Sequence, residues 1–189
     1  VLVDYRRTWL NRLGAEWTTQ AQIGQNTYLS TEFYQPVVES GRWFVAPFAQ
    51  IGQQTRGVFQ GDDKVADYLI KSTQIGLVGG AVLGTWGQVG IGPVFTHVNA
   101  SVDTGSPVLP SGSEDTSGIR ARLFVDQFDH AWFPTDGQSG TGSAYAALTA
   151  LGSAQRDQRL EGSFRVVRSW GRHTIQVGAA GGTDLGSDM

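Results

Sequence analysis

The chain has 189 residues, among them 26 glycines, six tryptophans and no cysteine, and its formal net charge is −3. The lack of cysteine excludes a disulfide scaffold and thiolate metal sites, and the lack of a basic excess argues against nucleic acid as a partner. No stretch reaches the roughly 18 apolar residues that a membrane-spanning helix needs.

Short segments of alternating polarity, separated by turns rich in Gly, Asp and Pro, run through nearly the whole chain. This alternation predicts ten strands, each with one polar and one apolar face, and no stretch has a helical period. In chain order the predicted strands are residues 1–10, 15–23, 27–37, 42–54, 64–82, 87–101, 118–129, 138–150, 157–169 and 172–181.

The predicted connections differ in length according to their order in the chain. Odd-numbered connections are mostly short, whereas the even-numbered ones at 55–63 and 102–117 are the longest. Exceptions are the short even turn at 24–26 and the longer odd turn that contains Pro134. Alternate connections of an up-and-down sheet share a rim, and outer-membrane barrels keep one rim short and the other long. The composition of residues 101–117 predicts an exposed, mobile loop.

Charged and aromatic residues are placed as in a membrane barrel. Arginine on a lipid-facing surface costs about 2–4 kcal/mol near the midplane, so charges on the polar strand faces would point into a lumen. A solvated face of a soluble sheet is the competing interpretation. Aromatic residues near predicted strand ends favour two interfacial girdles over a soluble core. The predicted lumen-facing charges are Arg6, Glu16, Glu32, Arg120, Arg122, Glu161 and Arg165.

No pattern of catalytic residues is found. Residues 137–143 hold glycines and serines but not a Gly-x-Ser-x-Gly elbow, and residues 76–80 lack the lysine of a phosphate loop. The histidines at 97, 130 and 173 have no paired spacing, and Asp62 with Asp63 is typical of a hairpin tip. Asp126 and Asp129 are expected to bond backbone N–H groups in a turn. No catalytic, metal-binding or cofactor-binding residue is predicted, and no cofactor.

Two motifs resemble a known family. Residues 31–37 (Thr-Glu-Phe-Tyr-Gln-Pro-Val) with 42–47 (Arg-Trp-Phe-Val-Ala-Pro) are similar to paired strands of the Omp85 superfamily, also called the bacterial surface antigen D15 type. The family's Asp-x-x-Asp-x-x-x-Phe-Pro-x-x-Gly turn is matched as well. Residues 7–17 look most like the barrels fused behind patatin-like phospholipases, which are classed with type Vd autotransporters. The matching positions are Phe33, Tyr34, Pro36 and Pro47 in the strand pair, and Asp126, Asp129, Phe133, Pro134 and Gly137 in the turn.

The resemblance implies an all-β, antiparallel, up-and-down transmembrane β-barrel of sixteen strands in the bacterial outer membrane. Residues 1–189 would be one partial barrel domain of about ten strands, truncated at both ends, with the turn at 126–137 on the periplasmic side. Its implied partners are outer-membrane lipid, the barrel assembly machinery during insertion, and the rest of its own barrel or a second copy.

The implied function is that of an anchor or translocator and not of an enzyme. Catalysis would belong to a patatin-like phospholipase domain outside this chain. Three alternatives stay open. The first is an assembly or secretion pore preceded by POTRA repeats, and the second is a passive porin-like channel, which the two motifs disfavour. The third is a soluble β-sandwich or lipocalin-like binder.

Overall fold

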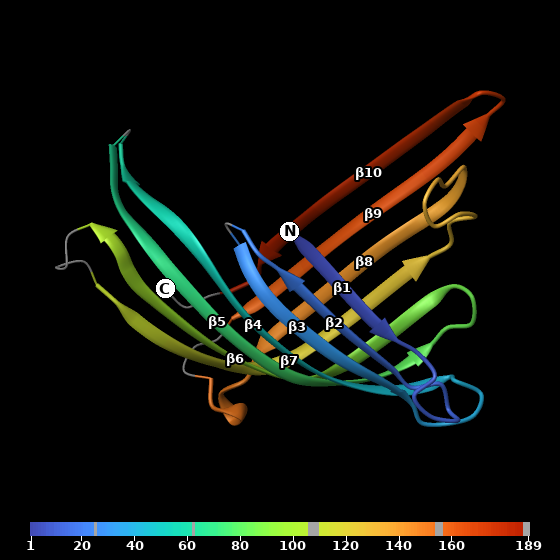
Figure 1. Ribbon diagram of the computed structural model, residues 1–189, viewed down its shortest axis with the longest axis horizontal. Coiled ribbons are helices and arrows are strands. Elements are labelled where there is room, and N and C mark those ends of the chain that lie inside the picture. The colour runs from blue at the N-terminus through green and yellow to red at the C-terminus, as the bar shows by residue number, and fades with distance from the viewer. Residues whose placement is uncertain (25, 62, 106–109, 154–156, 187–189) are drawn as a thin grey trace.

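A computed structural model describes residues 1–24, 26–61, 63–105, 110–153 and 157–186. They form a single antiparallel sheet of ten strands whose spatial order follows the chain (Figure 1). The predicted all-β, up-and-down architecture is therefore confirmed. The strands are β1 (Leu2–Arg7), β2 (Glu16–Gln22), β3 (Asn26–Pro36), β4 (Trp43–Gln60), β5 (Asp63–Val82), β6 (Gly87–Gly105), β7 (Gly112–Asp126), β8 (Asp136–Ala147), β9 (Gln158–Trp170) and β10 (His173–Asp184), with a short 3-10 turn, η1 (Thr149–Leu151), after β8.

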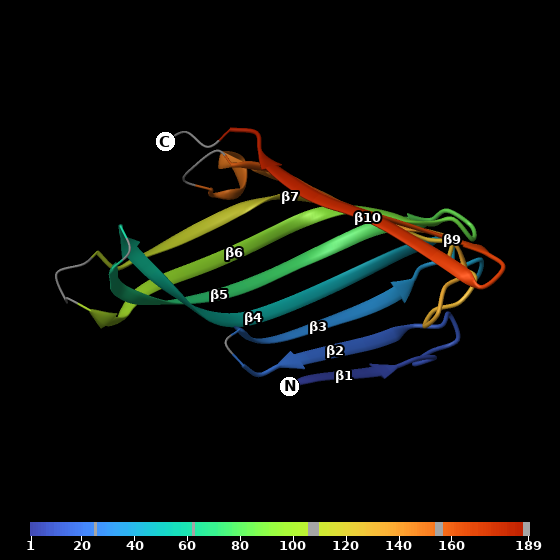
Figure 2. The same cartoon turned by 90° about the horizontal axis from the view of Figure 1, so that it is seen from above.

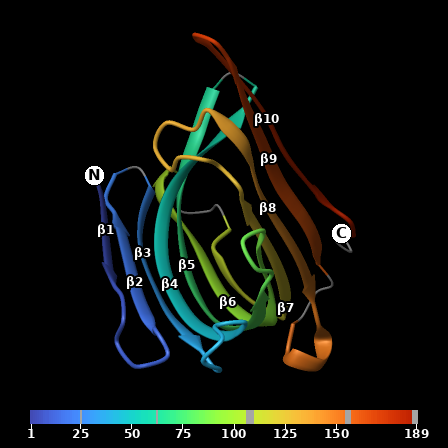
Figure 3. The ribbon, with the colours of Figure 1, turned by 90° about the vertical axis from the view of Figure 1, so that its right-hand side faces the viewer.

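The sheet is curled into a trough, with a concave and a convex face (Figures 2 and 3). β1 and β10 are its two edges and do not pair with each other, so the ten strands are not closed into a barrel. Among the described residues, no helix has the length and apolar character needed to cross a membrane.

The two ends of the trough are formed by alternate connections. The odd rim holds the connections after β1, β3, β5, β7 and β9, at residues 8–15, 37–42, 83–86, 127–135 and 171–172. The even rim holds the connections after β2, β4, β6 and β8. Figure 3 looks onto the odd rim, which lies on the right of Figure 1.

The prediction of long loops at the even rim is wrong, because most residues assigned to those loops extend the strands instead. Residues 55–60 of β4 pair with residues 63–69 of β5, with a bulge between Val58 and Phe59. Residues 101–105 continue β6 and 112–117 begin β7, while 106–109 and Asp62 lie outside the described residues. The β4–β5 hairpin mixes polar residues with Val58, Phe59 and Val65, which are 39–62% exposed, and it lacks the regular alternation of the rest of these strands.

Other strand ends shift for local reasons. β1 ends at Arg7 and not at residue 10, because Trp9 adopts a left-handed backbone with φ of 56°. The N–H groups of Leu13 and Ala15 donate to Asn11 Oδ1, which closes this connection. β8 ends at Ala147, and η1 follows it.

The buried core lies on the concave face, near the odd rim. It consists of Phe44, Ala46 and Val78, with Tyr34, Phe48 and Val82 packed around them. A Cβ at Gly80 would lie 2.5 Å from the Phe44 ring. Glycine on β5 therefore leaves the space in which this β4 ring lies flat against the sheet.

Candidate functional site

The convex face is apolar and exposed. Cross-strand register places one side-chain set on it, for example Leu29 opposite Ile51 and Ile75 opposite Phe95. Many large apolar residues of this set are 41–65% exposed, the fractions expected of a surface and not of a core. They include Val3, Trp17, Leu29, Trp43, Ile51, Ile75, Leu77, Ile91, Phe95, Phe164 and Val177.

The opposite set of side chains forms the concave face. The register places all seven charged residues singled out from the sequence on this face, distributed over β1, β2, β3, β7 and β9. Arg6 pairs with Glu16 on the neighbouring strand. The Arg165 guanidinium lies 5.8 Å from the Phe128 ring centroid.

A charge pair joins strands that are not neighbours. Arg122 of β7 donates to Glu32 Oε2 of β3 at 3.3 and 3.4 Å, although β4, β5 and β6 lie between these strands. The same guanidinium lies 5.6 Å from the Phe48 ring centroid. Arg120 reaches past β6 in the same way and donates to Gln74 Oε1 at 3.0 Å. Such contacts are possible only across the inside of a strongly curled sheet.

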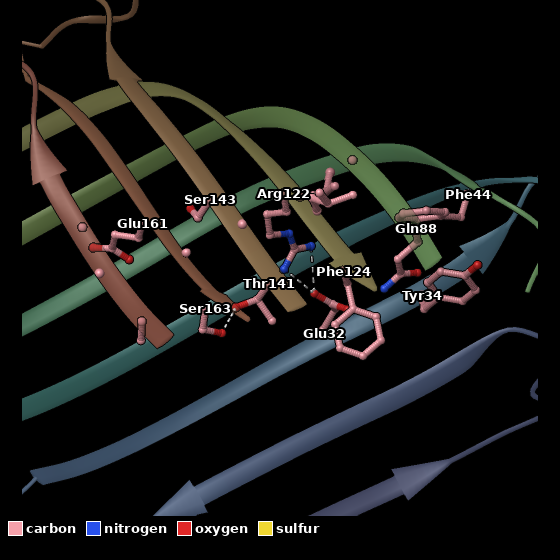
Figure 4. A pocket seen from close by; sticks show the side chains of 18 residues that line it. Glu32, Tyr34, Phe44, Gln88, Arg122, Phe124, Thr141, Ser143, Glu161 and Ser163 are labelled. Carbon is pink, nitrogen blue, oxygen red and sulfur yellow. Dashed lines mark hydrogen bonds and ion pairs between the residues drawn. The ribbon is translucent and has the colours of Figure 1, made fainter. Parts of the chain in front are cut away.

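The charge pair borders a hollow of about 670 Å³ (Figure 4). Tyr34, Phe44 and Phe124 give it an apolar wall, whereas Ser143 and Glu161 supply polar groups. A second hollow of about 640 Å³ shares Ser143 and Glu161 with the first and is lined by further polar and charged groups. Those further groups include Gln74, Thr96, Glu114, Arg120, Tyr145, Asp157, Arg159 and Asp184.

Hydroxyl groups line both hollows. Histidine is absent from the described lining of both, so neither hydroxyl-bearing wall has an imidazole base. Thr141 Oγ1 and Ser163 Oγ hydrogen-bond each other at 2.8 Å instead. Within the described ranges, no three His, Cys, Asp or Glu side chains cluster so as to hold a metal ion. Beside its apolar core, the concave face carries hydroxyl, carboxylate and guanidinium groups.

The connection between β7 and β8 is organised by Asp129. Its Oδ1 accepts hydrogen bonds from the N–H groups of His130, Thr135 and Asp136, at 3.0, 2.9 and 3.1 Å. The Thr135 hydroxyl donates to the other oxygen, and this bond contributes most to lowering the pKa of Asp129 well below its usual range. Asp126 accepts from the Phe128 N–H at 3.2 Å. The backbone bonding expected of these two aspartates is confirmed.

The remaining residues of this turn have distinct environments. Gly137 has φ of 118°, and a Cβ there would lie 2.1 Å from the Gln127 carbonyl oxygen, so only glycine fits without a shift. Phe133 and its neighbour Trp132 are 84% and 88% exposed. Pro134 lies just before the Thr135 N–H that bonds Asp129.

The strand-pair residues divide between the two faces. The Tyr34 ring packs on Phe44 with centroids 4.8 Å apart, and Pro36 is buried opposite Phe44. Phe33 lies on the convex face with Trp17, and Pro47 lies on the same face opposite Leu77. Phe33 and Pro47 thus belong to the exposed apolar surface, whereas Tyr34 and Pro36 support the concave core.

Two features were missed from the sequence. The partners that reach across the trough, Gln74 and Phe48, could not be found without the curvature, because no sequence spacing signals them. The second is that all the tryptophans lie at one rim, a distinction that the prediction of two aromatic girdles did not make. Counting turns along the chain would have shown this. The six residues are Trp9, Trp17, Trp43, Trp86, Trp132 and Trp170, each at or beside an odd-numbered connection.

No protein-family model and no curated protein matches this chain. The resemblance to the Omp85 superfamily accordingly rests on the strand-pair and turn motifs and on residues 7–17.

Proposed function

We propose that this chain is part of an outer-membrane β-barrel of the Omp85 type and acts as an anchor or translocator. One observation carries the proposal: exposed apolar side chains cover the middle of the convex face, while the seven charged residues predicted to face a lumen all lie on the concave face. A soluble barrel or lipocalin-like binder has the opposite arrangement, with apolar residues inside and polar residues outside.

The size of the apolar surface fits a membrane. On β4 it runs from Trp43 to Ile51, which spans about 26 Å along the strand at roughly 3.3 Å per residue. With the strand tilt of 35–45° that is usual for such barrels, its height is roughly 20 Å, close to the ~25 Å apolar band of outer-membrane barrels. Beyond this band the convex face becomes polar, with Gln53 on β4 and Lys71 on β5.

The mechanism proposed for this segment is physical. Ladder hydrogen bonds satisfy the backbone of the inner strands, which is what a lipid environment demands. β1 and β10 each present one unpaired edge, so stable insertion requires further strands, either the rest of a sixteen-stranded barrel or a second copy. During insertion the barrel assembly machinery would cover these edges. The polar concave face would then line the lumen.

We further infer that the parent protein carries a patatin-like phospholipase domain, on the similarity of residues 7–17 to barrels of that group. Its lipid hydrolysis would be catalysed outside this chain. The alternative parent is an assembly or secretion pore with POTRA repeats. The native reading frame upstream separates the two, since a Gly-x-Ser-x-Gly elbow indicates the lipase and repeats without an elbow indicate the pore.

Cysteine labelling in the full-length protein tests the membrane placement, because these 189 residues contain no cysteine of their own. Phe164 and Ser163 are neighbours on β9 that face the convex and concave sides. With any cysteine outside this chain replaced, Ser163→Cys should react with a water-soluble maleimide in outer-membrane vesicles. Phe164→Cys should react only with a lipid-soluble one. Equal reaction of both variants with the water-soluble reagent would refute the proposal.

A further inference from the structure

All six tryptophans of the chain lie on the odd rim. Each is 44–88% exposed, and Trp132 at the tip of the β7–β8 connection is the most exposed. Trp17, Trp43 and Trp170 stand on the convex face, at the strand ends that meet this rim. Indole rings favour the boundary between hydrocarbon and head groups, where the ring is shielded and the N–H can bond. The odd rim therefore has the character of a membrane interface.

Arginines lie on the same rim as these tryptophans. Arg7, Arg12, Arg42 and Arg172 are exposed on the same rim, and none of their guanidinium groups forms an ion pair or hydrogen bond with another described residue. The Arg42 guanidinium lies 5.9 Å from the Trp43 ring centroid. A guanidinium group can donate two parallel hydrogen bonds to the oxygens of one phosphate, and it is weakly hydrated.

The acidic residues of this rim are largely occupied. Asp136 is bound by Arg168, and Asp129 accepts three backbone N–H groups and a hydroxyl. Asp126 accepts one backbone N–H, and Glu39 is exposed. The four arginines are thus left as the cations available to an external anion.

The even rim differs in both respects. None of its described residues is tryptophan. Two of its cations are paired within the chain, Lys64 with Asp67 and Arg159 with Asp157. Lys71 and Arg56, near that end, are exposed and lie apart from any tryptophan. The two ends of the trough are therefore suited to different surroundings.

We propose that the odd rim binds anionic glycerophospholipid head groups, with the indoles at the acyl-ester level and the arginines on the phosphates. The inference rests on the proposed membrane function and adds an orientation to it. The odd rim lies in the glycerophospholipid leaflet, which in an outer membrane is the periplasmic one. This is the side that the resemblance implies for the turn at 126–137.

Tryptophan fluorescence tests this directly, because every indole of the chain reports from the same rim. The full-length protein, with any tryptophan outside this chain replaced by phenylalanine, is reconstituted in phosphatidylcholine vesicles that contain either brominated phosphatidylglycerol or brominated phosphatidylcholine. Bromine quenches a neighbouring indole. At equal mole fraction, brominated phosphatidylglycerol should quench more strongly, and the ratio of the two effects gives the relative lipid affinity.

Two matched double variants assign the preference to the rim. Removing Arg42 and Arg172 as Arg42→Gln/Arg172→Gln should lower the relative affinity at least about fivefold, since one arginine near a membrane surface contributes about that factor. The control Arg56→Gln/Lys71→Gln removes the same charge from exposed positions near the other end and should leave the preference unchanged. All four positions are exposed and unpaired among the described residues, so both variants should fold alike.

The outcomes separate the two proposals. If neither brominated lipid quenches the indoles, the membrane placement itself is wrong. If both quench equally, or if the control pair lowers the preference as much as the rim pair, the head-group inference fails and the anchor function stands. Inorganic phosphate should have no more effect than chloride of the same ionic strength. A specific loss in phosphate would show that the arginines take the free anion, and it would overturn the lipid assignment.

Discussion

Ile91→Arg is the substitution that tests the sidedness of the sheet most severely. Ile91 lies near the centre of the apolar stretch that runs from Val89 to Phe95 on the convex face of β6, and it is 59% exposed. Its cross-strand neighbours are Gly79 and Ala121, so no side chain beside it offers a counter-charge. Moving a whole isoleucine side chain from water into an apolar medium contributes about 1.5–3 kcal/mol. The 59% of Ile91 that faces lipid therefore contributes about 1–2 kcal/mol. Arginine near the midplane adds about 2–4 kcal/mol. The free energy of unfolding in a bilayer should therefore fall by about 3–6 kcal/mol.

The measurement is urea unfolding of the full-length protein in lipid vesicles, followed by tryptophan emission. The control is Ser163→Arg, which puts the same charge on the concave face, in the hollow that also contains Glu161. That variant should change the free energy of unfolding by no more than about 1 kcal/mol, the effect of losing one exposed hydrogen bond to Thr141. Equal destabilisation by the two substitutions, or a smaller effect at Ile91, would refute a lipid-facing convex surface.

Three further predictions concern the turn and the charge pair. Gly137→Ala should lower the free energy of unfolding by at least about 1–3 kcal/mol in the urea titration, because a φ of 118° is strained for alanine. The control Gly142→Ala, at a glycine in ordinary strand geometry, should lower it by less than about 1 kcal/mol. The pKa of Asp129 is lowered by folding, so the stability difference between the native protein and Asp129→Asn should be constant at neutral pH. It should shrink as pH falls below the ordinary carboxyl value of about 3.9; a difference that grew on acidification would contradict the hydrogen bonding. The side chains of Arg122 and Glu32 are 40% and 38% exposed. A double-mutant cycle with Arg122→Leu and Glu32→Gln should therefore give a coupling free energy of only about 0.2–1 kcal/mol, and added salt should reduce it. A larger coupling that salt does not change would show that the pair is desolvated.

The strands were predictable because alternation carries enough information to locate them. Each predicted strand corresponds to an observed one. Because successive side chains of a strand point to opposite faces, the face of each charged residue follows from its position along the strand. Strand ends were less predictable. Trp9 leaves β1 through a left-handed conformation that tryptophan rarely adopts, and no local residue signals it. The hairpin at 55–69 lacks regular alternation and contains a bulge, so a hydrophobic pattern does not reveal its pairing.

The site was predictable only as a set of residues on one face. Sequence reasoning placed Glu32 and Arg122 on polar strand faces, yet nothing in their spacing of 90 residues indicates that they meet. Their contact depends on how sharply β4, β5 and β6 curl. That curvature is a tertiary property. It follows from glycines that let the backbone bend and from rings that fill the space those glycines leave.

The concave face combines both kinds of residue for a physical reason. A curled sheet brings the side chains of its inner face closer together than those of its outer face, so large rings on every inner strand would clash. β4 carries the rings, Phe44 and Phe48, and β5 carries glycine beneath each of them, where a Cβ would come within 2.5 and 2.6 Å. Close packing at this point tightens the curl until Arg122 can reach β3. The apolar core on the concave face and the charge pair beside it are therefore two consequences of one curvature, and enlarging either glycine should weaken both.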